Sequence, residues 1–214
     1  MSEYLNNQKL SGAVKYLSKK DEDLAALYEE DGVPPLWARQ PGFSTLIKII
    51  IEQQVSLSSA KTVNKKLKSK IKPFTPMRFN ELGTAYIRSL GLTRQKSSYC
   101  MNIAKAILDD KLDLKSLNNL SDDDAKEMLT WIKGIGSWSA DIYLLMVLRR
   151  SDIWPSGDIA LATSMRKIKR LRSYPTNEKQ IRIAQKWRPY RSVAARMLWQ
   201  HYLNGKAKKQ DFRD

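Results

Sequence analysis

The sequence predicts an all-α fold, and two observations lead to this prediction. In most segments of the 214-residue chain, apolar residues recur every three or four positions, which is the spacing of one face of a helix. No run alternates polar and apolar residues for long enough to indicate a β-strand. A chain of this length can bury a substantial core and makes one large domain or two small ones.

The first helices are expected over residues 8–30, as one or two short segments that end at the turn-forming run DGVPP, residues 31–35. The next helix begins at Phe43 and carries an apolar stripe, and Gln54 completes the same stripe at the next turn. A lysine-rich helix follows over residues 61–72, and its charges indicate a solvated face.

The later elements are delimited by glycine and proline. Residues 90–92 (LGL) introduce a further helix and resemble a weak hairpin. The sharpest loop of the second half is WPSGD, residues 154–158. A final helix is expected from about Tyr190 to Leu203, followed by a polar, frayed tail from Gly205.

The most informative segment, residues 121–149, contains two helical patterns separated by a Gly-Ile-Gly turn. Ser121 can cap the first helix, and the second begins at Ser137. The two glycines let the backbone turn tightly and approach a ligand closely. Ile135, between them, can fill the space between the helices. The pattern is therefore a helix-hairpin-helix, although a bare Gly-x-Gly is more often an ordinary helix corner.

The hairpin is predicted to bind phosphate. The amides of Gly134, Gly136 and Ser137 lie at a free helix N-terminus, where unpaired N–H groups and the helix dipole attract anions. Lys133 precedes them and can contact the same phosphate. The whole chain has 38 Lys and Arg against 22 Asp and Glu, a net charge of +16, which favours a nucleic acid or an anionic membrane surface as partner.

Composition also excludes several classes. No signal peptide, lipidation motif or apolar run long enough to span a bilayer is present, so we expect an intracellular protein of the cytoplasm, nucleoid or nucleus, away from membranes. Cys100 is the only cysteine, which excludes an internal disulfide and a four-cysteine cluster. With His201 as the only histidine, we expect no zinc or iron site and no required cofactor.

Four blocks, taken with their order and spacing, resemble the helix-hairpin-helix (HhH-GPD) DNA glycosylases, specifically the DNA-3-methyladenine glycosylase II branch. They are Pro35–Arg39 with Phe43, Ile50–Ser56, Ile132–Ala140, and Pro155–Asp158 with Trp187–Ser192.

The resemblance implies an organisation of the chain. It implies two helical subdomains with an active-site cleft between them, and no extra N-terminal β-domain. Residues 41–150 would form the central subdomain, which contains the hairpin at about 121–149. Residues 1–40 would pack with residues 151–214, which hold the catalytic loop and the C-terminal helices.

The resemblance also implies an activity. The chain would flip alkylated purines of the 3-methyladenine and 7-methylguanine type out of double-stranded DNA and excise them, leaving an abasic site for base excision repair. We expect it to act as a monomer. Two alternatives stay open: a helix-hairpin-helix DNA-binding protein without catalysis, and a glycosylase for another lesion, such as a mismatch or an oxidised base.

Cleavage of an N-glycosidic bond builds positive charge on the sugar and needs a nearby carboxylate, which the resemblance places at Asp158. Asp158 also fits a plain helix N-cap. The two roles are compatible, because the dipole at a helix N-terminus favours a carboxylate anion. Asp141 and Asp152 are lower-ranked alternatives.

Trp138 indicates the reaction subtype. It stands where strand-cutting relatives carry a nucleophilic lysine, so no Schiff base can form there and a monofunctional enzyme is expected. Trp138, Trp199 and Ile142 would line the base pocket, where indole rings can stack on a cationic base; core packing is the alternative for each tryptophan. Ile142 replaces an aromatic residue of the better-known bacterial enzyme.

Two further roles come from the resemblance. Gln54 matches the wedge that fills the space left by the flipped base; the alternative is a polar helix terminus. The main-chain carbonyls of Thr130, Ile132 and Ile135 match those that hold a Na⁺ or K⁺ ion bridging the hairpin to a DNA phosphate.

Overall fold

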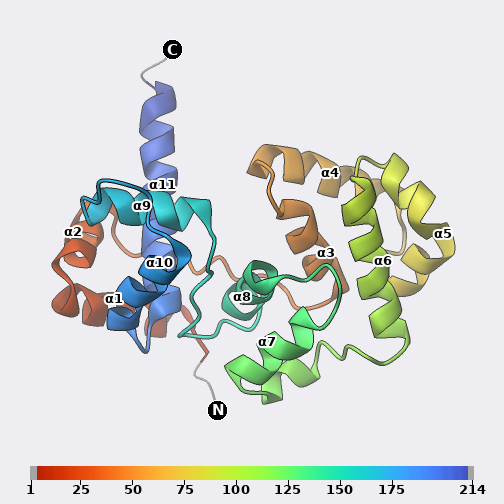
Figure 1. Ribbon diagram of the computed structural model, residues 1–214, viewed down its shortest axis with the longest axis horizontal. Coiled ribbons are helices and arrows are strands. Elements are labelled where there is room, and N and C mark those ends of the chain that lie inside the picture. Colours follow the sequence, from red (N-terminus) through yellow and green to blue (C-terminus); the bar gives the residue numbers. More distant parts are fainter. Residues whose placement is uncertain (1–3, 212–214) are drawn as a thin grey trace. The chain divides into compact units, whose positions relative to one another are not determined.

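The computed structural model describes residues 4–211, with side chains to residue 205. Within that range it contains eleven α-helices and no strand, apart from an isolated bridge between Tyr4 and Arg150 (Figure 1). The all-α prediction is therefore confirmed. The chain forms two compact units. Arg39–Leu148 makes one, the central unit; Ser2–Ala38 and Arg149–Asp214 together make the other, the terminal unit.

The central unit is built around one apolar helix, α3. Leu46, Ile47, Ile49 and Ile50 are all fully buried, because α4, α6 and α8 pack on different sides of α3. This explains why α3 is apolar around most of its circumference. The helices of the unit are α3 (Phe43–Glu52), α4 (Leu57–Lys70), α5 (Pro76–Ser89), α6 (Arg94–Leu108), α7 (Asp122–Thr130) and α8 (Ser137–Met146).

The expected place of Gln54 on the α3 stripe is wrong. The helix ends at Glu52, and Gln54 has a φ of +53°, in the left-handed region. This conformation breaks the helical period, so the side chain leaves the stripe and lies in the α3–α4 connection. The first helices end at the turn predicted over residues 31–35, and the lysines of α4 are exposed, as the predicted solvated face requires.

The terminal unit packs its helices on α11, which contacts α1, α2 and α9. Arg196 is fully buried on α11, and its guanidinium donates to the carbonyl oxygens of Leu36 (2.9 Å) and Ser192 (3.0 Å). These bonds tie the N-terminal segment to the C-terminal helix. The helices of the unit are α1 (Asn7–Lys20), α2 (Glu22–Asp31), α9 (Ile159–Ile168), α10 (Asn177–Ala184) and α11 (Arg191–Asp211).

Helix α11 is longer than the sequence pattern predicted. It continues to Asp211 instead of ending near Leu203 with a frayed tail from Gly205. After Gly205 the chain contains Lys, Ala and Gln and no proline, and these residues propagate a helix readily once it has formed. None of the described helices has the length and apolarity needed to cross a membrane.

Candidate functional site

The hairpin between α7 and α8 depends on Gly134. Its φ is +116°, and a Cβ atom at this position would lie 2.4 Å from Cγ of Tyr99. No side chain fits without displacing that ring, so glycine is required here. Gly136 differs, because its φ is −82° and a Cβ would meet nothing within 4 Å. Ile135 is buried between the two helices, as predicted.

The carbonyl side of the hairpin is held by the rest of the central unit. Gln53 Nε2 donates to the carbonyl oxygen of Gly134 (3.0 Å) and to Ser139 Oγ (2.8 Å). Asn102 Nδ2 donates to the carbonyl oxygen of Lys133 (3.0 Å). These bonds fix the turn from one side and leave its amide side available for a ligand.

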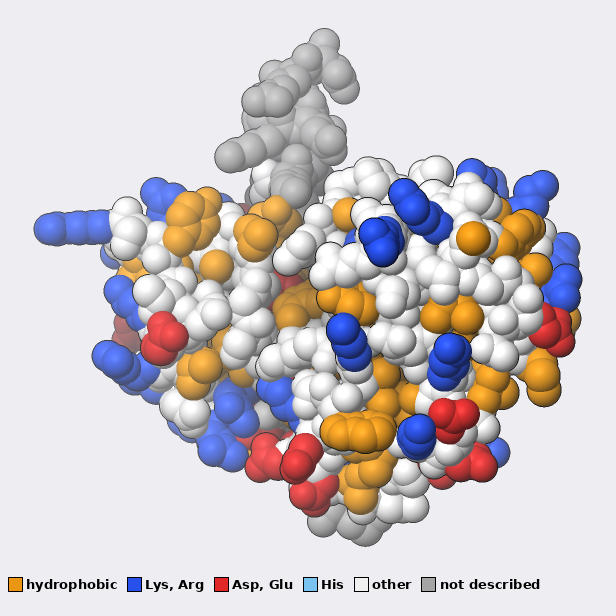
Figure 2. All heavy atoms as spheres, turned by 45° about the vertical axis from the view of Figure 1, so that its right-hand side comes forward, with side chains coloured by type: hydrophobic (Ala, Val, Ile, Leu, Met, Phe, Trp, Pro, Cys, Tyr) orange, Lys and Arg blue, Asp and Glu red, His pale blue; other side chains and the backbone are white. Residues whose placement is uncertain are grey.

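The amide side of the hairpin is accessible. Lys133, Gly136 and Ser137 are exposed, and α8 begins at Gly136 without a side-chain cap. An uncapped helix start presents N–H groups that an anion can satisfy. Figure 2, which brings the α4–α6 side forward, shows Lys and Arg side chains scattered over that face without forming one continuous basic patch. The hairpin amides are therefore a candidate anion site that does not depend on one continuous basic patch.

Asp158 is the N-cap of α9, as predicted from its sequence context. Its Oδ1 accepts from the backbone N–H of Leu161 (2.9 Å) and from Nε1–H of Trp199 (3.2 Å). Both donors come from rigid helices, so the carboxylate is held in one orientation at the positive end of the α9 dipole. Such a group can stabilise a cation that forms beside it.

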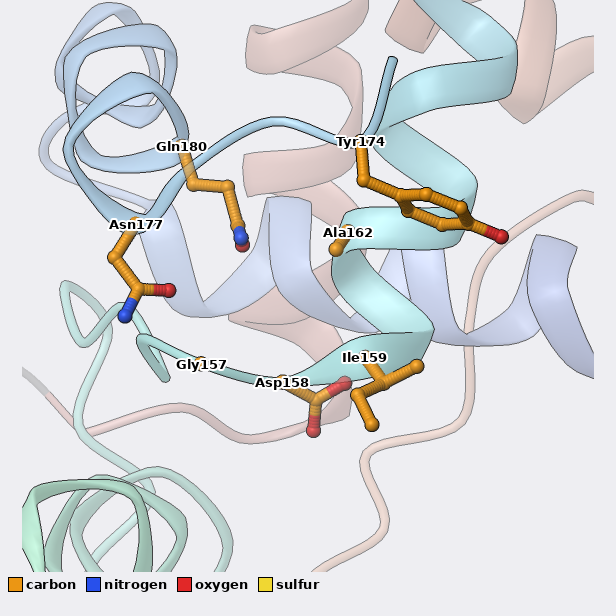
Figure 3. A pocket seen from close by; sticks show the side chains of 7 residues that line it. All are labelled: Gly157, Asp158, Ile159, Ala162, Tyr174, Asn177 and Gln180. Carbon is orange, nitrogen blue, oxygen red and sulfur yellow. The ribbon is translucent and has the colours of Figure 1, made fainter.

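An open hollow of about 340 Å³ adjoins the loop that carries Asp158. Figure 3 shows the side chains of Asp158 and Ile159 directed away from Asn177 and Gln180, which come from α10. The lining of the hollow is Gly157, Asp158, Ile159, Ala162, Tyr174, Asn177 and Gln180.

Trp199 and Trp37 form an aromatic pair next to Asp158. Their ring centroids are 6.4 Å apart at an interplanar angle of 70°, an edge-to-face arrangement. Trp199 is only 8% exposed, which leaves little of its ring for stacking. Trp37 has a φ of +47°, which is uncommon for an aromatic residue. Trp37 lies in the block Pro35–Arg39, and the sequence alone predicted no role for it.

The sequence also matches a known family of proteins over the region that holds the hairpin and Asp158. The sequence model of the HhH-GPD superfamily, described as base excision DNA repair proteins, matches residues 47–189. This range includes the hairpin and Asp158. The chain belongs to the HhH-GPD superfamily.

The individual relatives share about a quarter of their residues with this chain. The Bacillus subtilis protein YfjP is 28% identical over 184 residues, which are 82% of this chain but only 64% of YfjP. DNA-3-methyladenine glycosylase 1 of Schizosaccharomyces pombe is 27% identical over 161 residues, 73% of this chain and 71% of that protein. The solved structure of S. pombe 3-methyladenine DNA glycosylase (Mag1) with abasic DNA has a TM-score of 0.78 at 25% identity, covering 88% of this chain and 95% of Mag1.

The two lower-ranked carboxylates of this HhH-GPD chain have other partners. Asp141 is 1% exposed and paired with Lys126 Nζ at 2.7 Å. That ion pair joins α7 to α8. Asp152 accepts from the guanidinium groups of Arg188 (3.0 Å) and Arg191 (2.9 Å). Neutralised carboxylates of this kind are poor candidates for stabilising a sugar cation.

The remaining predicted pocket residues lie on α8. Trp138 is the second residue of the helix and is partly exposed, whereas Ile142 is 2% exposed. Gln54 is exposed in the α3–α4 connection. The carbonyl oxygen of Ile132 accepts from the N–H of Ile135 (2.9 Å) within the hairpin. The pocket, the wedge, the cation site and the cleft between the subdomains stay predictions.

The structure also brings two carboxylates and the histidine together in a cluster that the number of His and Cys residues did not predict. Glu30, Asp31 and His201 place potential ligand atoms within 4.8 Å of one another. His201 Nδ1 is 3.2 Å from one oxygen of Asp31, and Asn204 Nδ2 donates to the other at 2.7 Å. These contacts satisfy Asp31 and join the end of α2 to α11, so hydrogen bonding accounts for the arrangement.

Proposed function

We propose that this chain is a monofunctional DNA glycosylase of the DNA-3-methyladenine glycosylase II branch. It would flip alkylated purines out of double-stranded DNA and hydrolyse their N-glycosidic bonds, leaving abasic sites. The observation that carries the proposal is Asp158, an oriented carboxylate at a helix N-terminus in a chain of a base excision repair superfamily. The names of the S. pombe relatives support 3-methyladenine as a substrate.

The proposed role of Asp158 is electrostatic. As the bond to the base breaks, the sugar becomes an oxocarbenium ion, and an ionised carboxylate next to the anomeric carbon stabilises that charge. A 3-methylated or 7-methylated purine is already cationic, so it can leave without receiving a proton. One carboxylate is therefore sufficient, and a second acid is not needed.

Trp138 supports the monofunctional subtype. A glycosylase that also cuts the strand needs an amine to form a Schiff base with the sugar, and an indole cannot supply one. We assign Trp138 to the wall of the base pocket, because its ring is partly exposed. Ile142 would back that wall from within the core. Trp199 is better suited to orienting Asp158 than to stacking, since its ring is nearly buried and its N–H reaches the carboxylate.

DNA binding is assigned to two loops of the central unit. The amides of Gly134, Gly136 and Ser137, with Lys133, would hold one phosphate, helped by a Na⁺ or K⁺ ion on the carbonyls of Thr130, Ile132 and Ile135. Gln54 would enter the duplex and fill the space left by the flipped base. We propose that the protein acts as a monomer and requires no other cofactor.

The test is a duplex oligonucleotide that carries a single 7-methylguanine. After incubation with the protein, the strand should remain intact until alkali is added, and then break at the modified position. The control is the same 7-methylguanine duplex given the same alkali treatment without protein, because alkali alone also attacks 7-methylguanine; the break must depend on the protein. A break before alkali treatment would contradict the monofunctional subtype, and no alkali-labile site would contradict the activity.

A further inference from the structure

The Gln54 loop, residues 53–57, combines exposure with an unfavourable backbone conformation. Gln54 adopts the left-handed φ of +53° that helix ends normally reserve for glycine. The next large side chains, Val55 and Leu57, are 46% and 67% exposed. A loop that displays apolar groups in a strained conformation needs support from the surrounding structure to persist.

Lys96 of α6 supplies part of that support. Its Nζ donates to the carbonyl oxygens of Ile51 (2.7 Å) and Gln53 (2.6 Å). Such carbonyls at a helix C-terminus lack helical partners and attract a cation. The ammonium is partly removed from water to make these contacts, and this burial lowers the pKa of Lys96. Lys96 therefore fixes the backbone on both sides of Glu52.

The side of helix α6 that carries Lys96 also supports the hairpin. Lys96, Tyr99 and Asn102 are spaced by three residues and therefore follow one side of the helix. Tyr99 packs against Gly134, and Asn102 donates to the carbonyl oxygen of Lys133 (3.0 Å). One row of side chains thus holds the Gln54 loop at one end and the hairpin at the other.

Gln53 connects the two loops directly. Its backbone carbonyl is held by Lys96, while its side-chain amide donates to Gly134 O (3.0 Å) and Ser139 Oγ (2.8 Å). A displacement of the Gln54 loop would therefore have to break bonds to α6 and to the hairpin together.

We propose that Lys96 and Gln53 are positioning residues for base flipping. They hold the Gln54 loop at a fixed distance from the hairpin, so that Gln54 enters the duplex at the base defined by the phosphate on the hairpin. This inference rests on the proposed function, in which Gln54 is the wedge.

The test compares Lys96→Met with Lys105→Met. Both variants remove one positive charge from α6, but Lys105 is exposed in the last turn of the helix, whereas Lys96 lies in its first turn. Single-turnover excision is measured on 7-methylguanine opposite cytosine and opposite a mismatched base, where flipping costs less. For Lys96→Met we expect a loss of about tenfold on the paired lesion, the size of losing hydrogen bonds from a charged donor, and a much smaller loss on the mismatched lesion.

A second comparison tests whether Lys96 acts through Gln54. If it does, Lys96→Met should cost little more rate in a Gln54→Ala background, because residues that act as a unit are not additive. Gln53→Leu removes the hydrogen bonds of the side-chain amide and keeps a similar side-chain volume. It should show the same preference for the mismatched lesion. It replaces Lys96→Met as the test if that variant melts far below the wild type.

The outcomes separate this inference from the proposed function. The positioning role alone would be overturned if the wild-type protein excises the lesion but Lys96→Met loses equal rate on paired and mismatched lesions. Additive losses in the Lys96→Met, Gln54→Ala double variant would overturn it in the same way. A wild-type protein that excises nothing from either duplex would overturn the proposed function and the inference with it. Wild-type rates for Lys96→Met and Gln53→Leu would also overturn the positioning role.

Discussion

Replacing Asp158 with Asn separates its catalytic role from its role as a helix cap. Oδ1 of Asp158 accepts hydrogen bonds from Leu161 N–H (2.9 Å) and Trp199 Nε1–H (3.2 Å). The carbonyl oxygen of Asn can accept both bonds, and Asn and Asp are nearly equal as N-caps. We therefore expect a loss in the free energy of unfolding of at most about 1 kcal/mol, equivalent to roughly 2–4 °C in Tm for a chain of this size.

The rate should fall much further, because the substitution removes the negative charge. Loss of one preorganised electrostatic group costs about 2.7–4 kcal/mol of transition-state stabilisation, or roughly a hundred- to a thousandfold in rate. The assay is single-turnover excision of 7-methylguanine from a duplex, with affinity for a duplex containing an abasic-site analogue measured in parallel. Affinity should change far less than rate, because the sugar cation exists only during the reaction.

Trp199→Phe is the matched control for this variant. It keeps an aromatic ring beside Trp37, although a smaller one, and removes the indole N–H that reaches Asp158. Since one hydrogen bond to a charged group is worth about 1.5–3 kcal/mol, its rate loss should be smaller than that of Asp158→Asn. An Asp158→Asn protein that excises at close to the wild-type rate would refute the assignment and leave Asp158 as a cap only.

Borohydride should not trap the protein on damaged DNA, because Trp138 offers no amine; a covalent adduct formed during turnover would contradict this. Gly136→Val should weaken binding to any DNA sequence and leave Tm nearly unchanged, since its Cβ meets open space, whereas Gly134→Val should lower Tm; normal binding by a folded Gly136→Val protein would exclude the hairpin as the phosphate site. Burial raises the pKa of both Cys100 and Tyr143 to about 12, from ordinary values of 9.0 and 10.0. The free energy of unfolding should therefore fall as the pH rises above about 9, by up to about 1.4 kcal/mol per pH unit for each group, and Tyr143→Phe should reduce that slope in denaturant titrations; an unchanged slope would contradict it.

The features that the sequence predicted well are local ones. The cap at Asp158, the burial of Ile135 and the start of α8 at Ser137 each depend on residues within one or two turns. Such signals survive folding because capping and helical periodicity act over short stretches of chain. The all-α class follows from the same periodicity.

The features that the sequence missed depend on contacts between distant segments. Gln54 does not continue the apolar stripe of α3, because the backbone is left-handed at that residue. The periodicity of the sequence does not reveal this conformation. The hydrogen bond from Trp199 to Asp158 joins positions 41 residues apart, and that from Gln53 to Gly134 joins positions 81 apart. Asp141 was an alternative catalytic carboxylate until the structure showed its ion pair with Lys126. Each of these required the tertiary structure, because only packing brings the partners together.

The proposed function requires this chain to excise alkylated purines from DNA. The most direct measurement incubates the protein with methylated duplex DNA and identifies the released bases by mass spectrometry. We expect free 3-methyladenine and 7-methylguanine, with release reduced at least about a hundredfold by Asp158→Asn. Tight binding to the same DNA without release of any base would contradict the proposed function and identify the protein as a helix-hairpin-helix DNA-binding protein without catalysis.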